Sequence, residues 1–469
     1  MKKLFVVFLL AVTAIGLAGC KKATSYAIDW DVISDDLEFD KETPVTVVFW
    51  HTMAKTSDPS QGQQALLDLF IQEFKVLYPN VTIVHEQKGG YTELRKAIDN
   101  ALPAGNEPTM AYSYPDHVAG YIQSGQVLPL NNLINNKNAE IALSEEDIAD
   151  FIPGYWAEGQ VYDNRGSILN LPFLKSTEVM FYNKTFFDKN NLTVPTTWDE
   201  VKTVSQQIKT IDPTKTPFGY DAGDNLFITA SEQKNIPYTS VDDQGNGKIL
   251  FNNEDAKDMV RYFDEMYEAG LITTKDMLGG KYTSDMFKAG NLFMSIGSTG
   301  GTTHNIPGNN EFEVGVAPIP QFDLNNKAVI QQGPNINLFR KSNVQENIAA
   351  WLFLKYITAA EQTARWSVAT GYSPVRTSAY DLPVLKDYLE QTPPGESATA
   401  QEKAAYIRTK VYIDVANVGK VQSSYMFTSV VFPNSSKVRD EVGNIFTVVF
   451  GNTKSVDDAF DDAYDEARY

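Results

Sequence analysis

The sequence is poor in the residues that build metal and redox sites. It contains one cysteine, Cys20, and four histidines in 469 residues. A single cysteine excludes an internal disulfide and any zinc site that needs several thiolates. No two histidines stand at the spacing of metal ligands; they are His51, His85, His117 and His304. We therefore expect neither a metal site nor a cofactor.

Motifs of catalysis are also missing. The sequence has no G-x-S-x-G, no H-E-x-x-H and no G-x-x-x-x-G-K-[ST], which mark nucleophilic serine, zinc-protease and phosphate-binding sites. Acid pairs such as Asp221 and Asp224 could in principle serve a glycosidase. With 59 Asp and Glu residues, however, such pairs are expected by chance. The sequence therefore favours a protein that is not an enzyme.

Positive charge is in deficit. The chain has 40 Lys and Arg residues against 59 Asp and Glu residues, a net charge of −19. A surface of this sign repels nucleic acid and anionic lipid headgroups, so we expect no nucleic-acid partner. The hydrophobic content of 43% is enough for packed cores, and the length exceeds what one core supports, which predicts two or more domains.

The one long hydrophobic run lies at the N-terminus. Lys2 and Lys3 precede an apolar stretch over residues 4–18, and Leu17-Ala18-Gly19 leads into Cys20. The run is shorter than the roughly 20 residues of a membrane span. It resembles a lipoprotein signal, which implies a signal peptide over 1–19 and a fatty acyl chain such as palmitate on Cys20. The alternative is an ordinary cleaved signal with a chance cysteine.

This N-terminus predicts the location of the protein. Removal of Lys2 and Lys3 would leave 38 basic against 59 acidic residues, a net charge of −21. Contact with the membrane would then come from the lipid on Cys20, not from the protein surface. Residues 20–43 are polar and acidic and predict a flexible tether. We expect a lipoprotein outside the cytoplasmic membrane.

The next hundred residues alternate between strands and helices. Runs rich in β-branched and aromatic residues predict strands, and apolar residues at helical spacing predict helices between them. This order predicts an α/β fold with a parallel sheet and right-handed crossovers. Farther along, Thr197 and Glu200 have the spacing of a capping box at a helix start. The predicted strands are 45–50, 81–85 and 109–114, and the helices are 63–78 and 91–101.

The stretch Leu171 to Lys184 organises the rest of the chain. It predicts a strand over 168–173 and a second strand over 178–182. Pro172 has no N–H to donate, which suits an edge or a crossing point. One interpretation is a strand that leaves one lobe and enters another, with a ligand cleft beside it. The other is two consecutive strands of one sheet.

Polar and aromatic residues follow the ends of several predicted strands. Ligands gather at the carboxyl ends of parallel strands, and carboxylates, amides and aromatic faces together suit a polyhydroxylated ligand. Taken singly, Asp116 could be a helix cap and Tyr372 a half-buried packing residue. The candidate ligand-binding residues are Trp50, His51, Tyr91, Asp116, His117, Ser176, Asp224, Ser298, Thr299, Gly333, Asn335 and Tyr372.

Several motifs in one order carry a resemblance to a known family. They are FWHTM at 49–53, KGGY at 88–91, PF-x-x-ST-x-V-x-x-YNK at 172–184, TWDE at 197–200, TGYSPV at 370–375 and the Ser/Gly turn after Met294. Together the chain resembles the extracellular solute-binding proteins of ABC importers, family 1, and more closely their glycerol-3-phosphate-binding branch. The resemblance implies a two-lobe, maltose-binding-like (type II) periplasmic-binding-protein fold. It also implies that the protein catalyses no reaction and delivers a ligand to membrane permease subunits.

The resemblance implies domain boundaries and part of the site. Lobe 1 would comprise 44–174 plus 319–375, and lobe 2 would comprise 175–318 plus 376–469. A monomer is expected. Ligand contacts of the glycerol-3-phosphate branch match Tyr91, Ser176, Ser298, the Gly333-Pro334 turn and Tyr372.

The chain also departs from that branch. The branch has tryptophans in the loop matching 221–227, where this chain has Asp224 and Phe227, and a glutamate near the position of Pro115. It also has a phosphate-binding arginine near 424–430, where this chain has none. Without that arginine the fork best suited to a phosphate is missing. The sequence therefore favours a neutral sugar or oligosaccharide, and the alternatives are glycerol-3-phosphate or a glycerophosphodiester, a secreted glycosidase and an adhesin.

Overall fold

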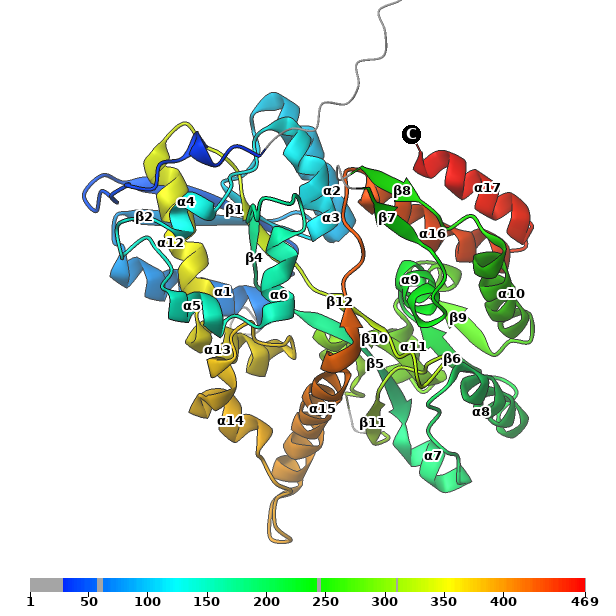
Figure 1. Cartoon of the computed structure of the whole chain (residues 1–469). Coiled ribbons are helices and arrows are strands. Elements are labelled where there is room, and N and C mark those ends of the chain that lie inside the picture. The colour runs from blue at the N-terminus through cyan, green and yellow to red at the C-terminus, as the bar shows by residue number, and fades with distance from the viewer. Residues whose placement is uncertain (1–27, 57–61, 243–245, 309–310, 469) are drawn as a thin grey trace, which may run out of the picture.

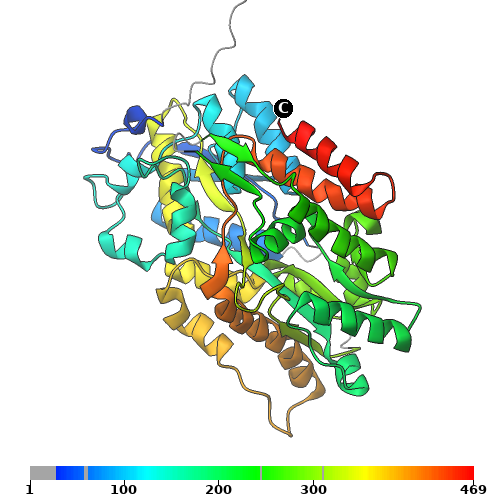
Figure 2. The same ribbon diagram turned by 45° about the vertical axis from the view of Figure 1, so that its right-hand side comes forward.

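The computed structural model describes residues 28–56, 62–242, 246–308 and 311–468. Two sheets with their helices form two lobes that lie side by side (Figure 1). Turning the molecule by 45° shows α15 (Ala400–Gln422) at the lower side of the molecule (Figure 2). Among the described residues, no helix combines the length and the apolar character needed to span a membrane.

The first lobe is built on a five-stranded sheet. Its order is β2 (Val81–Gln87), β1 (Val45–His51), β3 (Met110–Ser113), β13 (Asn335–Leu338) and β4 (Asn170–Pro172). Strand β1 pairs in parallel with β2 and β3, as the alternating pattern predicts, with α1 (Gly62–Leu77) and α2 (Tyr91–Ala101) as the connections. Strand β13 arrives from far along the chain and pairs antiparallel with β3 and β4.

Buried side chains explain why this lobe folds as it does. In β1, Val45, Val47 and Phe49 alternate inward, as expected of a strand with one face on a core. Helix α12 (Val344–Ile357) is apolar nearly all round and packs against β1, with Trp351 and Phe353 fully buried. The lobe is completed by α3 (Pro115–Tyr121), α5 (Glu145–Asp150), α6 (Pro153–Ala157), α13 (Ala360–Thr370) and α14 (Pro383–Leu389).

The second lobe is built around β5 (Ser176–Asn183). Its sheet has the order β14 (Met426–Phe427), β12 (Val329–Gln332), β5, β10 (Leu292–Ser298), β6 (Thr216–Tyr220) and β9 (Ile272–Thr274), and β11 (Val314–Ala317) also pairs with β5. Trp198, Phe263 and Phe446 lie in its aromatic core. The helices around it are α7 (Lys184–Asn190), α8 (Trp198–Ile211), α9 (Gly223–Gln233), α10 (Glu254–Glu268), α11 (Thr283–Lys288), α16 (Ser435–Phe450) and α17 (Val456–Ala467).

Within the described residues, the chain passes between the two lobe sheets at two short segments, and a third time over the long stretch between β13 and β14. Strands β4 and β5 belong to different sheets, so the chain crosses at 173–175, as the crossing interpretation of this stretch predicts. It returns between β12 and β13, at Gly333-Pro334. The sequence placed this return near 319, but Ile319, Val329 and Ile330 pack in the second core. We therefore propose the two-lobe partition with the return moved to Gly333-Pro334.

Two further boundaries differ from the expectation. The predicted tether extends to 43, yet Ile28, Ile33 and Phe39 are buried in the first core, so the tether prediction is wrong for residues 28–43. Their apolar side chains are spaced among polar ones, which hides them from a composition-based reading. At the other end, Ala379 and Leu385 pack against α13, so the first lobe continues past 375 to α14.

Candidate functional site

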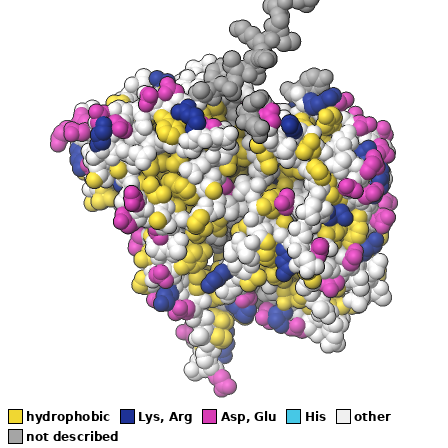
Figure 3. Space-filling view, viewed as in Figure 1, with side chains coloured by type: hydrophobic (Ala, Val, Ile, Leu, Met, Phe, Trp, Pro, Cys, Tyr) yellow, Lys and Arg dark blue, Asp and Glu magenta, His cyan; other side chains and the backbone are white. Residues whose placement is uncertain are grey.

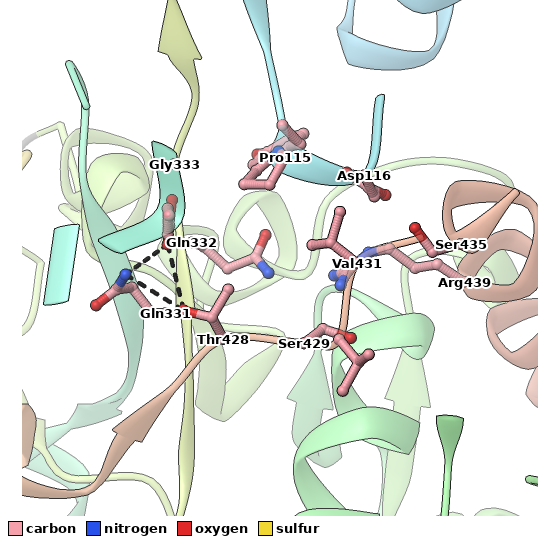
Figure 4. Close-up of a pocket in the computed structure, with 13 residues that line it drawn as sticks. Pro115, Asp116, Gln331, Gln332, Gly333, Thr428, Ser429, Val431, Ser435 and Arg439 are labelled. Carbon is pink, nitrogen blue, oxygen red and sulfur yellow. Dashed lines mark hydrogen bonds between the residues drawn. The ribbon is translucent and has the colours of Figure 1, made fainter. Parts of the chain in front are cut away.

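A small cavity lies where the two lobes meet. Its volume is about 50 Å³, well below the several hundred Å³ usual for small-molecule pockets. A ligand of sugar size therefore requires the lobes to move apart. The lining residues are Tyr114, Pro115, Asp116, Glu158, Gln331, Gln332, Gly333, Thr428, Ser429, Val430, Val431, Ser435 and Arg439. In Figure 4, Pro115 and Asp116 of the first lobe lie across from Val431, Ser435 and Arg439 of the second.

One wall of the cavity carries an ion pair. Arg439 of α16 donates from Nε to Asp224 Oδ2 at 2.6 Å and also hydrogen-bonds Asn225 Oδ1. Burial alone would lower the pKa of Arg439, but the carboxylates of Asp224 and Asp116 outweigh it and raise that pKa. The carboxylate of the predicted site residue Asp224 is therefore already paired with Arg439, and the guanidinium stays charged.

Asp116 faces the same cavity from the opposite lobe. It stands in the first turn of α3, and its Oδ1 accepts a hydrogen bond from the backbone N–H of His117 at 3.0 Å. No described residue forms an ion pair with Asp116 within 4.0 Å. Its other oxygen is left to accept from hydroxyl or N–H groups of a ligand.

Three tyrosines gather beside Asp116. The ring centroids of Tyr91 and Tyr114 are 4.9 Å apart, and the Tyr91 hydroxyl interacts with the side chains of Tyr114, Tyr372 and Thr52. Burial raises the pKa of each of these tyrosines, so their hydroxyls remain neutral. Tyr372 also reaches the second lobe, because a Cβ built on Gly300 would lie 2.4 Å from its ring. This cluster offers aromatic faces and hydroxyls from the first lobe, and Tyr372 contacts the second lobe across the boundary.

Neither His117 nor Trp50 lines the cavity. His117 is buried, its ring stands edge-on to Tyr114 at 5.4 Å, and burial lowers its pKa. The half-buried Trp50 ring lies under the ammonium of Lys88, 4.1 Å from its centroid. Its indole N–H finds no acceptor among the described residues.

His51 is a core residue and does not face the cavity. It is fully buried; its Nδ1 accepts from the Met53 N–H at 3.1 Å and its Nε2 lies 2.9 Å from His85 Nδ1. With Nδ1 accepting, Nε2 carries the proton and donates to His85. His51 is therefore not among the proposed ligand contacts.

This buried histidine predicts a pH-dependent stability. Burial, and then the nearby His85, lower the pKa of His51 from 6.5 to about 3. Below 6.5 the unfolded chain takes up a proton that the folded chain refuses, so stability falls as pH falls. We expect His51 to contribute a loss of about 1 kcal/mol between pH 6.5 and roughly pH 5.5. Urea titrations of wild type and His51→Leu should show that this contribution is absent from the variant.

A matched control is the exposed His304. His304→Leu should keep the wild-type slope, and an unchanged slope in His51→Leu would contradict the assignment. Glu178 acts in the opposite direction across this whole interval, because burial raises its pKa to about 7. It is present in all three proteins, so its contribution cancels in the comparison.

Three further predicted residues belong to the framework around the site. Asn335 is fully buried; its Nδ2 donates to Glu158 and Asn170, and its Oδ1 accepts from Lys175. The Thr299 hydroxyl accepts from the Thr177 N–H at 3.3 Å. Ser176 is buried and pairs with Gln332 in the sheet. Asn335 and Thr299 therefore use their polar side chains within the crossing region.

The remaining two predicted residues lie at turns. Ser298 caps the 3-10 turn Thr299–Asn305 by accepting from the Gly300 N–H at 3.1 Å. Gly333 lines the cavity and has a φ of +104°. That backbone conformation favours glycine, and the turn brings the two crossing segments into contact.

Sequence reasoning missed Glu158, Gln331, Thr428 and Arg439. All four line the cavity, but Glu158 and Arg439 lie in helical segments whose local pattern carries no sign of a site. The resemblance places a phosphate-binding arginine near 424–430, whereas here the turn into α16 brings Arg439 to the cavity. Within the ranges the structure describes, no three His, Cys, Asp or Glu residues are grouped so as to hold a metal ion.

The sequence of this chain is similar to those of known proteins. Residues 70–393 match the family described as bacterial extracellular solute-binding protein. The chain is 26% identical over 370 residues to the sn-glycerol-3-phosphate-binding periplasmic protein UgpB of Escherichia coli K12, covering 76% of this chain and 80% of that protein.

Solved structures share the fold at lower identity. The ABC substrate-binding protein Lmo0181 from Listeria monocytogenes in complex with cycloalternan superposes with a TM-score of 0.71 at 15% identity, covering 91% of this chain and 98% of that one. UgpB from Mycobacterium tuberculosis in complex with glycerophosphocholine superposes with a TM-score of 0.68 at 18% identity, covering 90% and 97%. The match over 70–393 spans more than half of the chain, and the protein therefore belongs to the bacterial extracellular solute-binding protein family.

Proposed function

We propose that this protein is the substrate-binding lipoprotein of an ABC importer and captures a carbohydrate between its lobes. The observation that carries the proposal is the cavity at the lobe boundary, where an unpaired carboxylate stands beside a cluster of tyrosines. Carboxylates accept from paired hydroxyls, and aromatic rings cover the apolar faces of a sugar. The protein would release its ligand to permease subunits in the membrane, without catalysis.

The proposed contacts are fewer than the sequence indicated. Asp116 accepts from ligand hydroxyls, Tyr114 lines the cavity, and Tyr91 and Tyr372 close it from the side of the first lobe. The backbone at Gly333 and the side chains of Gln332 and Ser429 add polar contacts. Asp224 acts through Arg439, which it holds against the cavity wall.

A thermal-shift screen tests the ligand class. A ligand that binds only the folded protein raises Tm, by mass action. We expect a sugar or oligosaccharide to raise Tm and to compact the protein in small-angle X-ray scattering, because the lobes close on it. A rise without compaction would favour an adhesin, and turnover of the sugar would favour a glycosidase.

The second candidate ligand is a glycerophosphodiester, and Arg439 favours it. A guanidinium on the cavity wall is a suitable partner for a phosphate, and the relatives include proteins named for glycerol-3-phosphate and glycerophosphocholine. The charge of Arg439 is already balanced by Asp224, and this favours the neutral ligand. Adding glycerophosphodiesters to the same screen, with Arg439→Met as a variant, separates the two. Only a phosphate ligand should lose most of its affinity in that variant.

We also propose that Cys20 carries the lipid that anchors the protein outside the cytoplasmic membrane. Cys20 lies outside the described residues, and the proposal rests on the N-terminal signal pattern. Cys20→Ala should release the protein into the soluble fraction, because the variant lacks the thiol that would carry the lipid. Fractionation and immunoblotting measure this directly. Cys20→Ala that remains with the membrane would contradict the anchor.

A further inference from the structure

We propose that Glu158 ties the crossing segments together and thereby sets the angle between the lobes. Glu158 begins the 3-10 turn Glu158–Gln160 of the first lobe, and its side chain is only 3% exposed. Four side chains direct polar groups at its carboxylate. Oε2 accepts from Lys175 Nζ at 2.5 Å and from Asn335 Nδ2 at 3.1 Å. Oε1 accepts from Gln331 Nε2 at 2.5 Å and from the Thr428 hydroxyl at 3.4 Å.

The four partners come from separate segments at the lobe boundary. Lys175 lies in the first crossing, between β4 and β5. Gln331 and Asn335 lie on either side of the second crossing, in β12 and β13. Thr428 directly follows β14, and Figure 4 shows it beside Gln331. One carboxylate therefore contacts both crossings and the strand of the C-terminal tail.

Lys175 completes this network from the other side. Its ammonium is fully buried and donates to the Gly333 carbonyl at 3.0 Å and to Asn335 Oδ1 at 3.2 Å. Burial lowers the pKa of Lys175, and the charge of Glu158 opposes that shift. A buried pair of this kind holds only when its remaining hydrogen-bonding groups are satisfied. Here the groups that satisfy the Glu158–Lys175 pair lie at or beside the two crossings.

The network favours one arrangement of the lobes. Glu158 and Asn335 belong to the first lobe, whereas Gln331 and Thr428 belong to the second. A rotation that separates the lobes moves the Gln331 and Thr428 donors away from Oε1. Because the lobes lie close together when all four donors are in place, the carboxylate favours their approach. Glu158 is a positioning residue that acts through the two crossings, whatever ligand fills the cavity.

A distance measurement without ligand tests this inference. The full chain carrying Cys20→Ser has no other cysteine, so Val76→Cys in α1 and Ile211→Cys in α8 accept one spin label each. Both positions are exposed, at 79% and 46%, and they lie on different lobes. In Glu158→Gln the amide NH₂ faces other donors, so we expect the inter-label distance distribution to shift to longer distances and to broaden.

The matched control is another ion pair of low exposure. Lys341 Nζ lies 3.0 Å from Glu107 Oε1, and both residues lie in the first lobe, away from the crossings. Glu107→Gln should lower Tm and leave the distance distribution unchanged. If Glu158→Gln lowers Tm without changing the inter-label distance distribution, the role of Glu158 is merely structural and the proposal is overturned.

A milder variant covers the case in which Glu158→Gln fails to fold. Gln331→Met removes one of the two donors from the second lobe and leaves the Glu158–Lys175 pair intact. The same shift in distance, of smaller size, is expected. A wild-type distribution in this variant would also overturn the proposal. Because no ligand is present, these outcomes are independent of the proposed carbohydrate ligand.

Discussion

Gly333→Ala is expected to lower the free energy of unfolding by about 4 kcal/mol or more, which is exceptional for one methyl group. A Cβ at this position would lie 1.8 Å from the carbonyl oxygen of Leu174 and 2.9 Å from the Cα of Lys175. These are backbone atoms of the first crossing and cannot rotate aside. The φ of +104° adds strain for any residue with a Cβ. The two crossings must therefore separate to admit the methyl group.

Gly105→Ala is the matched control for that substitution. Gly105 also has a positive φ, of +66°, but a Cβ there meets nothing within 4 Å. Its cost should be limited to backbone strain, about 1 kcal/mol. Thermal unfolding of both variants checks the comparison. Equal losses in the two would show that the contact between the crossings contributes little.

The sequence predicts the first lobe well where neighbours in the chain are neighbours in the sheet. Strands β1, β2 and β3 follow from periodicity and the intervening helices, and all three pair in parallel as predicted. The capping box at Thr197 and Glu200 also forms as expected. These features depend on local patterns, which a single sequence displays.

Long-range pairing is not visible in such patterns. Strand β13 inserts between β3 and β4 although more than 150 residues separate it from either. Nothing in its composition states which sheet it joins, so the position of the return crossing rests on the resemblance, whose boundary near 319 precedes the observed one at Gly333-Pro334. Acidic side chains gather toward the outer edges of the molecule in the space-filling view (Figure 3), and this distribution likewise depends on the tertiary fold.

The candidate site divides in the same way. Asp116 and Gly333 follow strand ends and do line the cavity. His51 and Asn335 also stand at strand ends, but both side chains are fully buried, and Asn335 is held by Glu158 and Asn170. Arg439 and Glu158 come from helical segments that only the tertiary fold brings to the cavity.

The expected effect of Asp116→Ala is a ten- to hundredfold loss of affinity for the carbohydrate, or about 1.5–3 kcal/mol, the usual contribution of hydrogen bonds to a charged group. Asp116 has no ion-pair partner among the described residues, so its carboxylate is free to accept from the ligand. When the lobes close, the ligand hydroxyls lose water and need this acceptor. Isothermal titration with the best ligand from the screen measures the loss.

A control variant and the competing ligand class make this test decisive. Glu146→Ala removes the same charge from the exposed face of α5 and should leave affinity unchanged. If the ligand carries a phosphate, the Asp116 carboxylate repels it, and Asp116→Ala should bind as tightly as wild type or more tightly. Since Arg439 stays paired with Asp224 in this variant, the change reports on Asp116 alone. Unchanged affinity for the carbohydrate in Asp116→Ala would contradict the proposed site while leaving the fold intact.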